Sequence, residues 1–362
     1  MGQTGTLSEQ LREIPAQFED YLARFFRQNT ERYAYGPLFE PIYRDLSSFV
    51  LRRGKRIRPL LFLASYRIFG GCLPLDSPPV LQAATSLELL HTFILIHDDI
   101  IDRSETRRGL PTFHKLMEAL LGKLTDRERM GQNLAVVLGD MLFALAIDTL
   151  ATAEFPPGPR DLAQRRLLQY VTDTGCGETF DILLGVRDIS RVTEPEIEQM
   201  YDLKTTRYTF EAPLVLGALL SGADHQLVHE VAMVAEPLGL AFQMQNDLQE
   251  FSHFDPLDRA MQTDLLEGKK TLLLRLAYER LEPMDRSFLQ LCLQAPSVKD
   301  SSIIKIKELV DKSGAVTVLQ ERQQQLLVKA GNLLRALAFS DEQRAGIHEI
   351  MEIVRQNLQG NG

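Results

Sequence analysis

The sequence predicts an all-α protein, and three observations carry that prediction. Apolar residues recur every three or four positions through most of the 362-residue chain. No Asn-Gly turn lies between two alternating runs, a pattern that would indicate a β-hairpin. Hydrophobic residues make up 44% of the chain and charged residues 25%, which is enough for a sizeable helical core. We expect one large domain over residues 1–362, with about the first ten residues flexible.

The expected helices follow one another between short breakers. Periodic segments cover residues 80–101, 133–153 and 225–248. Pro78-Pro79 suits the start of the first segment, because the first turn of a helix has no partner for the N–H that proline lacks. Breakers at 156–159 and 254–256 follow the other two segments. No repeat or long linker separates the segments, which favours a single bundle.

Charge and composition limit the classes of function. A net charge of -9 argues against binding to nucleic acid. Cys72, Cys176 and Cys292 match no metal-ligand spacing, so we expect small buried hydrophobic side chains in a reducing compartment. The N-terminus lacks a signal-peptide pattern, and no uninterrupted apolar run approaches about 18 residues. We therefore expect a cytoplasmic protein without a membrane span.

A stripe of polar residues interrupts the apolar segment 80–101. Four of them are spaced so that they share one helix face: Glu88, His91, Asp98 and Asp102. Because the rest of the segment is almost entirely apolar, other helices should surround it. An unpaired buried charge is costly, so the stripe predicts a water-filled cavity beside the helix.

Asp98 and Asp102 are one helical turn apart, so their carboxylates point the same way. Mg²⁺ prefers a few carboxylate oxygens and fills its other positions with water and substrate phosphate. An isolated pair of this kind is more often a solvated helix end. Here apolar residues precede the pair and Arg107-Arg108-Gly109 follows it, which favours a metal site.

A second acidic cluster and three groups of cations complete the pattern. Gln243, Asn246 and Glu250 share a helix face, although alone they indicate only the polar end of a helix. Cations gather at 52–59, at Lys204 and at 268–271, and each group alone is typical of a protein surface. Two acidic helix ends combined with these cations predict a site for a metal-bridged diphosphate.

Six motif regions occur in a defined order: GKRIRP, HxxxxxHDDIID with RRG, GETFD, KTT, FQMQND and DLLEGKKT. From about Leu51 to the C-terminal helices, this series resembles the trans-type polyprenyl diphosphate synthases. The resemblance implies the isoprenoid synthase fold, a single large helical bundle around a central cavity, usually as a homodimer. It also implies a short-chain prenyltransferase that condenses isopentenyl diphosphate with an allylic prenyl diphosphate, by magnesium-assisted ionisation of the allylic substrate.

The resemblance also implies roles for individual residues. The expected ligands for up to three Mg²⁺ ions are Asp98, Asp102, Asn246 and Glu250, with Asp99 in support. The residues expected to bind isopentenyl diphosphate are Lys55, Arg58, His91 and Arg108. Those expected on the allylic side are Arg107, Lys204, Thr205, Gln243 and Lys269, with Asp181 as an acid near the reacting centre. The residues expected to be catalytic are Asp98, Asp102, Arg107 and Lys204.

Phe93 and Ile94 lie just before the first acidic motif, where the resemblance implies the floor of the product tunnel. Phe93 is five residues before Asp98, about 7 Å down a helix. Ordinary core packing explains Phe93 equally well. With no insertion inside DDIID, the bulk of Phe93 indicates a fifteen- or twenty-carbon product, with geranylgeranyl diphosphate favoured.

The second half of the expected site departs from the family pattern. Asn246 stands where the family has an aspartate, and an amide oxygen brings no charge, so a third metal ion should bind more weakly. Asp258 and Gln262 replace two glycines, Arg259 replaces a lysine, and Asp264 is retained.

These departures leave two alternatives open. One is a terpene-cyclase-like or unusual coupling enzyme that uses a single allylic diphosphate, although such an enzyme has little use for Lys55, Arg58 and the other isopentenyl diphosphate ligands. The other is a non-catalytic subunit that modulates a partner synthase, although such a subunit needs no metal-binding carboxylates at Asp98 and Asp102. The prenyltransferase is therefore favoured.

Overall fold

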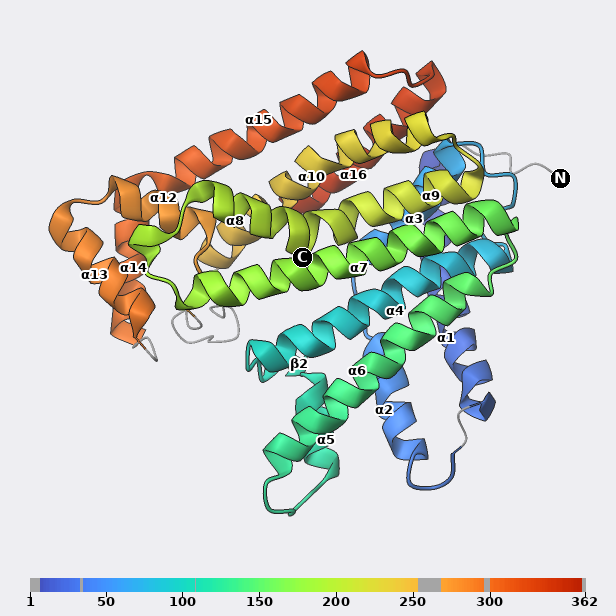
Figure 1. Cartoon of the computed structure of the whole chain (residues 1–362), viewed down its shortest axis with the longest axis horizontal. Coiled ribbons are helices and arrows are strands. Elements are labelled where there is room, and N and C mark those ends of the chain that lie inside the picture. The colour runs from blue at the N-terminus through green and yellow to red at the C-terminus, as the bar shows by residue number, and fades with distance from the viewer. Residues whose placement is uncertain (1–6, 33–34, 108, 253–267, 296–299, 360–362) are drawn as a thin grey trace. The chain divides into compact units, whose positions relative to one another are not determined.

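The computed structural model describes residues 7–32, 35–107, 109–252, 268–295 and 300–359. Helices form nearly all of this part of the chain (Figure 1), and its strands are the two-residue β1 (Thr106–Arg107) and β2 (Leu110–Pro111). The predicted all-α class is therefore confirmed.

The contacts within the chain divide it into two compact units. Unit 1 comprises Met1–Arg165 and Leu216–Ala223, and unit 2 comprises Arg166–Val215 and Asp224–Gly362. Two helices, α7 (Pro157–Val186) and α9 (Ala212–Ser221), contribute residues to both units. The expectation of one domain around a central cavity stays a prediction.

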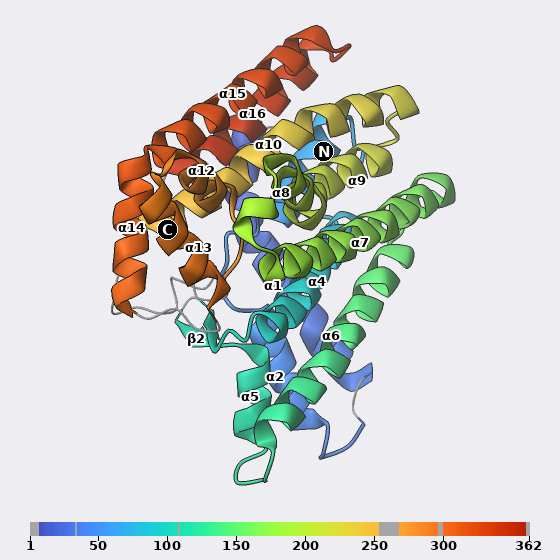
Figure 2. The same ribbon diagram turned by 60° about the vertical axis from the view of Figure 1, so that its left-hand side comes forward.

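The remaining helices of unit 1 precede α7 in the chain. They are α1 (Leu7–Arg32), α2 (Glu40–Val50), α3 (Ile57–Ile68), α4 (Pro78–Ile101), α5 (Phe113–Leu120) and α6 (Arg127–Ala151). Helices α4 and α6 run side by side in Figures 1 and 2. Gly139 of α6 faces the imidazole of His97 on α4, where a Cβ would lie 2.7 Å from Nε2. The predicted helix start at Pro78 is confirmed, with Ser77 as the N-cap.

Helices α4 and α6 are also long and apolar enough to cross a membrane, by length and composition alone. In the most apolar window of each, 67% of α4 and 44% of α6 is buried within the chain. A buried core helix of a water-soluble protein passes the same test, so two such helices are weak evidence for a membrane protein. The expectation of no membrane span stays a prediction.

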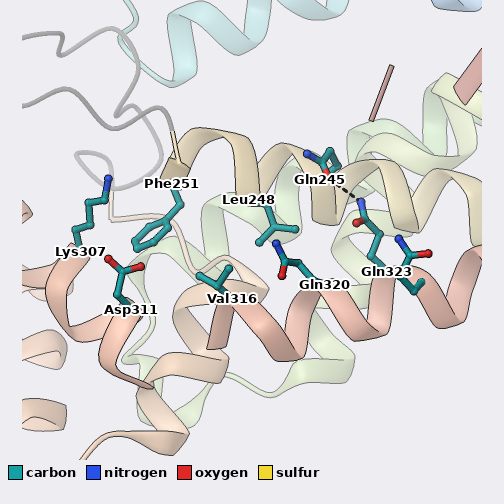
Figure 3. A pocket seen from close by; sticks show the side chains of 9 residues that line it. Gln245, Leu248, Phe251, Lys307, Asp311, Val316, Gln320 and Gln323 are labelled. Atoms are coloured by element: carbon teal, nitrogen blue, oxygen red, sulfur yellow. Dashed lines mark hydrogen bonds between the residues drawn. The ribbon is translucent and has the colours of Figure 1, made fainter. Parts of the chain in front are cut away.

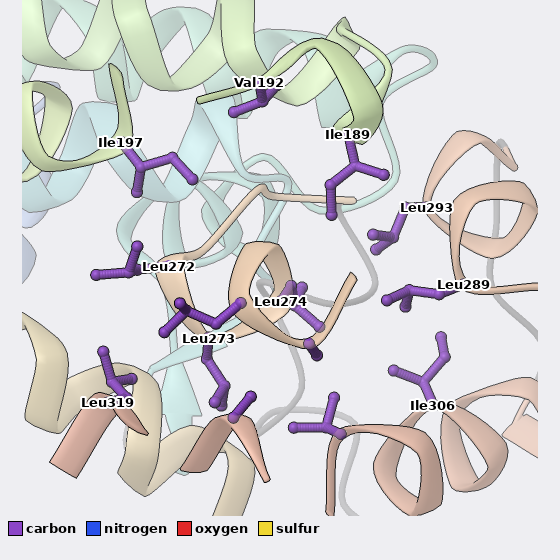
Figure 4. Close-up of a cluster of buried hydrophobic side chains, with 14 of the residues drawn as sticks. Ile189, Val192, Ile197, Leu272, Leu273, Leu274, Leu289, Leu293, Ile306 and Leu319 are labelled. Atoms are coloured by element: carbon purple, nitrogen blue, oxygen red, sulfur yellow. The ribbon is translucent and has the colours of Figure 1, made fainter. Parts of the chain in front are cut away.

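Unit 2 holds the C-terminal half of the chain. Its helices besides α7 and α9 are η1 (Ile189–Arg191), α8 (Glu194–Tyr201), η2 (Asp202–Glu211), α10 (His225–Ser252), α12 (Leu272–Arg280), α13 (Pro283–Gln294), α14 (Asp300–Ser313), α15 (Ala315–Ala336) and α16 (Asp341–Gln359). Leu272, Leu273 and Leu274 of α12 lie at the centre of a hydrophobic core (Figure 4). Side chains from η1, α8, α13, α14 and α15 surround them. Consecutive leucines point in different directions around a helix, so α12 is buried on several sides.

Between α8 and α9 the chain forms a π-helix, η2, which is wider than an α-helix. It packs against α10 at Gly239, where a Cβ would lie 2.5 Å from Cγ2 of Thr206. π-Helical turns are found frequently at functional sites. Here η2 carries Lys204 and Thr205, two of the expected site residues.

The cysteines differ from their predicted burial. Cys72 and Cys176 are exposed and Cys292 is half-buried, and all three are free thiols. The prediction of buried side chains is therefore wrong for the first two. Cysteine is often buried as a small hydrophobe, but this tendency carries no positional signal. Cys72 lies after α3, outside any helix, and Cys176 lies on an exposed face of α7.

A lysine is buried where the chain enters the core of unit 2. Lys270 is 1% exposed, and its Nζ donates to the carbonyl oxygens of Gly185 (3.0 Å), Leu293 (3.3 Å) and Gly268. Burial lowers the pKa of Lys270 to about 8, although Asp188 opposes the shift. The ammonium group is therefore charged at neutral pH inside a hydrophobic unit.

We predict that the free energy of unfolding of the wild type rises, relative to that of Lys270→Met, between about pH 8 and pH 10.5. The folded lysine loses its proton near pH 8 and the unfolded lysine keeps it to about 10.5, so the unfolded state binds more protons in this window. Urea unfolding at a series of pH values measures the difference. A difference that stays constant across the window would contradict the lowered pKa of Lys270.

Candidate active site

Asp98 and Asp99 belong to the last turn of α4, and Asp102 caps its C-terminus. The N–H of Asp102 donates to the carbonyl oxygen of Asp98 (2.8 Å). One carboxylate oxygen of Asp98 and one of Asp102 lie within 4.8 Å of each other, and both side chains are half-buried. The one-turn spacing therefore brings the two carboxylates together as predicted.

The β1–β2 hairpin brings Arg107 back onto this helix end. Gly109, with a φ of +73°, makes the tight turn. Nε of Arg107 donates to Oδ1 of Asp99 (2.8 Å), and Nη2 donates to Oδ2 of Asp98 (3.1 Å). Arg107 thus neutralises part of the acidic cluster, and its role toward the allylic diphosphate stays a prediction.

The charges at this end of α4 interact strongly. Burial raises the pKa of Asp99 to about 6, although the neighbouring Arg107 opposes the shift. Burial lowers the pKa of Arg107, but Asp99 and Asp98 outweigh that effect and the net shift is upward. The carboxylate of Asp99 is therefore still ionised at neutral pH, with the guanidinium as its counterion.

The oxygens at this helix end fit a divalent ion. Asp98 and Asp102 offer half-buried carboxylates of the kind that Mg²⁺ prefers. Oδ2 of Asp99 is buried without a hydrogen-bond partner in the part of the chain that the structure describes. Asp98 and Asp102 would hold the ion, with Asp99 behind them. When bound, Mg²⁺ would supply positive charge that stabilises a diphosphate leaving group.

The expected ligands of isopentenyl diphosphate lie in unit 1. Lys55 is exposed in the loop before α3, Arg58 is half-buried at the start of α3, and His91 is half-buried on α4. Arg108 lies outside the described residues.

The polar stripe on α4 does not border a water-filled cavity along its whole length. Glu88 is buried, and it pairs with the guanidinium of Arg56, 32 residues earlier in the chain. The predicted water-filled cavity is therefore wrong at Glu88, because an ion pair satisfies the buried charge there. Arg56 was not among the expected site residues.

In unit 2, Lys204 lies between two carboxylates of α7. Its Nζ is 2.6 Å from Oδ2 of Asp181 and 2.7 Å from Oε2 of Glu178. Gly177 permits this arrangement, because a Cβ there would lie 2.3 Å from the backbone nitrogen of Lys204. Thr205 follows in η2 and is half-buried. Glu178 was not predicted, although its spacing of three residues from Asp181 puts both on one helix face.

Asp247 of α10 is a buried structural carboxylate. Its Oδ2 accepts a hydrogen bond from the hydroxyl group of Tyr201, whose oxygen accepts one from the N–H of Leu272 (2.8 Å). Its Oδ1 accepts a hydrogen bond from Nε2 of Gln243 (3.2 Å). These bonds tie α8, α10 and α12 together, and they hold Gln243 at one end of the second acidic cluster.

The other two members of that cluster lie on α10 as well. Asn246 and Glu250 are half-buried, one turn apart on α10, and Lys269 is half-buried just before α12. Their roles as metal and diphosphate ligands stay predictions. Four expected positions lie outside the described residues: Asp258, Arg259, Gln262 and Asp264.

Phe93 packs against α6. The centroid of its ring is 5.3 Å from that of Phe143 and 4.8 Å from that of His97. Nε2 of His97 in turn lies 3.3 Å from the carbonyl oxygen of Val136. Ordinary packing is thus present, and the role of Phe93 and the half-buried Ile94 as a tunnel floor stays a prediction.

A pocket of about 560 Å³ lies on another face of α10 (Figure 3). Its lining is rich in amides, and Nε2 of Gln323 donates to Oε1 of Gln245 across it (2.9 Å). Residues 245, 248 and 251 line the pocket, whereas Asn246 and Glu250 occupy a different side of the helix. This pocket is therefore separate from the second acidic cluster.

The helices and the carboxylates at the end of α4 fit a class of all-α enzymes that use divalent metal ions. The chain belongs to the polyprenyl synthetase family, whose model matches residues 40–311. It is therefore a prenyltransferase.

Individual relatives agree with this assignment. The chain is 30% identical to the geranylgeranyl diphosphate synthase of Methanosarcina mazei over 68% of this chain and 70% of that one. It is 28% identical to the geranylfarnesyl diphosphate synthase of Aeropyrum pernix, over 84% of this chain and 91% of that one. A crystal structure of geranylgeranyl pyrophosphate synthase from Corynebacterium glutamicum, complexed with isoprenyl diphosphate and magnesium, matches with a TM-score of 0.85 and 29% identity. That match covers 96% of this chain and 99% of that one, which confirms the predicted isoprenoid synthase fold.

We predict that Asp98→Asn lowers the rate of turnover by at least about a hundredfold without unfolding the protein. The amide keeps the shape of the side chain but removes the charge that a divalent ion needs. Steady-state kinetics and thermal unfolding measure the two effects. Asp161→Asn, which removes an exposed carboxylate on α7, is the matched control and should leave the rate unchanged. Near-normal turnover by Asp98→Asn would remove this residue from the metal site.

We predict that Asn246→Asp lowers the Mg²⁺ concentration needed for half-maximal rate. The change restores a charged oxygen ligand at the expected third ion. A magnesium titration of the initial rate measures the shift. Gln245→Glu adds the same charge to another face of α10 and keeps the oxygen that accepts from Gln323, so it should not shift the titration. Equal titrations for Asn246→Asp and the wild type would count against a metal ligand at this position.

Proposed function

We propose that the protein condenses isopentenyl diphosphate with an allylic prenyl diphosphate to give a fifteen- or twenty-carbon product, with geranylgeranyl diphosphate favoured. The observation that carries this proposal is the acidic end of α4. There, Asp98 and Asp102 offer carboxylate oxygens within 4.8 Å of each other, and Arg107 pairs with Asp99 behind them. Membership of the polyprenyl synthetase family supports the same reaction.

Each group of residues would have a distinct task. Up to three Mg²⁺ ions would be held by Asp98, Asp102, Asn246 and Glu250. The allylic diphosphate would be bound by Arg107, Lys204, Thr205, Gln243 and Lys269. Isopentenyl diphosphate would be bound by Lys55, Arg58, His91 and Arg108. Asp181 and Glu178 would orient Lys204, because its ammonium group lies against both carboxylates. No side chain is required as a nucleophile, since the protein binds, orients and excludes water.

The two alternatives are less well supported. A cyclase-like enzyme would use one allylic diphosphate, and a modulating subunit would have no activity of its own. The relatives are named as diphosphate synthases, which favours neither alternative.

Incubation of the purified protein with Mg²⁺, isopentenyl diphosphate and each common allylic diphosphate tests the proposal. We expect a prenyl diphosphate product only when both substrates are present. Product from an allylic diphosphate alone would indicate the cyclase-like enzyme. No product under any combination would indicate the subunit.

We predict that Phe93→Ala lengthens the product. Removing the ring from its place between His97 and Phe143 would open space below the acidic motif for a longer tail. Chromatography of dephosphorylated products measures chain length. Phe288→Ala removes a half-buried ring from unit 2 and is the control. An unchanged product distribution for Phe93→Ala would assign the floor to other residues.

We expect a homodimer in which α6 is covered by a second copy of the chain. Only 44% of the most apolar window of α6 is buried within one chain, and Met130, Val136 and Val137 are exposed along it. Sedimentation velocity should show a dimer for the wild type and a monomer for Val137→Glu. Val186→Glu, at an exposed position on α7, should remain dimeric. A monomeric wild type would contradict this expectation.

The proposed location is the cytoplasm, with α4 and α6 serving as packing helices and not as membrane spans. The burial of 67% of the apolar window of α4 supports this reading for that helix, and the proposed dimer contact would cover more of α6.

A further inference from the structure

In two of the cationic motifs, a more exposed cation is directly followed by a buried one. In GKRIRP, Lys55 is exposed while Arg56 is only 8% exposed. In GKKT, Lys269 is half-buried while Lys270 is fully buried. A charge placed in the interior is costly and needs a compensating structural role.

Arg56 connects three helices of unit 1. Its Nε donates to Oε1 of Glu19 on α1 (2.7 Å), and Nη1 donates to Oε1 of Glu88 on α4. Its Nη2 donates to the carbonyl oxygens of Val50 (3.2 Å) and Arg52 (3.0 Å), at and just beyond the end of α2. Burial lowers the pKa of Arg56, but the two glutamates outweigh it and the net shift is upward. The guanidinium is therefore permanently charged, and each of its three nitrogens donates to a protein oxygen.

These contacts fix the backbone that carries Lys55. Arg56 has a φ of +45°, an uncommon conformation for a residue other than glycine, and it is the N-cap of α3. Such a conformation persists only where the surroundings hold it in place. Lys55 directly precedes this fixed residue, and Arg58 is two residues after it.

Lys270 has an equivalent position in unit 2. Gly185 and Leu293, whose carbonyl oxygens accept from its Nζ, lie in the last turns of α7 and α13. The ammonium group therefore sits at the negative ends of two helix dipoles. Its third bond, to the carbonyl oxygen of Gly268, closes the turn that contains Lys269.

We propose that Arg56 and Lys270 are positioning residues, each of which fixes the neighbouring cation that binds substrate. Arg56 orients Lys55 and Arg58 toward isopentenyl diphosphate. Lys270 orients Lys269 toward the allylic diphosphate. This inference rests on the proposed function for the identity of the two substrates. Neither residue would contact a substrate, because Arg56 and Lys270 donate to protein oxygens.

The test is the Michaelis constant of each substrate for Arg56→Met and Lys270→Met. Methionine keeps an unbranched side chain and removes the donors. We expect Arg56→Met to raise the KM of isopentenyl diphosphate by about tenfold or more and to change that of the allylic substrate less than about twofold. Lys270→Met should show the reverse, so each variant is the matched control for the other.

Thermal unfolding of both variants separates positioning from general destabilisation. A purely structural role would lower the melting temperature and leave the ratio of the two KM values unchanged, which would overturn the inference. If Arg56→Met does not fold, Glu88→Gln weakens the same network and should shift the same KM. If Lys270→Met does not fold, Lys270→Gln keeps two donors without charge and should again shift only the allylic KM.

Failure of the proposed function would look different, because the wild type itself would then form no product from the two substrates. Calorimetric binding of isopentenyl diphosphate and of a thiolo analogue of geranyl diphosphate then gives the same comparison without turnover. We expect each variant to weaken binding of one ligand only. Equal weakening of both ligands, or of neither, would overturn the inference.

Discussion

The concentration of negative charge at the end of α4 is the constraint on which the site depends. Asp98, Asp99 and Asp102 repel one another, and the C-terminus of a helix is already the negative end of its dipole. Arg107 offsets part of this charge through Asp98 and Asp99, but one guanidinium cannot balance three carboxylates. The helix end therefore favours divalent cations, and a diphosphate is the anion that those cations would attract.

The surrounding structure holds these charges before a substrate binds. Apolar side chains bury most of α4, and α6 packs along it. In unit 2, Gly177 and the wide turn of η2 hold Lys204 between Glu178 and Asp181. A reaction that needs no protein nucleophile depends on this kind of prior orientation, because charge stabilisation and positioning supply the catalysis.

Features that depend on local spacing could be predicted from the sequence, and features that depend on distant partners could not. The helices and the common face of Asp98 and Asp102 follow directly from the helical period. The burial of Arg56 depends on Glu19 and Glu88, which are 37 and 32 residues away. Similarly, the structural role of Asp247 depends on Tyr201, 46 residues earlier, whose hydroxyl group donates a hydrogen bond to its carboxylate. The π-helix also gives no clear sequence signal, since one extra residue in a turn barely alters the apolar pattern.

The most direct test of this account is a crystal structure of the protein with Mg²⁺ and a non-hydrolysable prenyl diphosphate analogue. The account predicts an ion coordinated by Asp98 and Asp102, with the diphosphate of the analogue completing its coordination. A bound diphosphate with no metal ion beside these two carboxylates would contradict it.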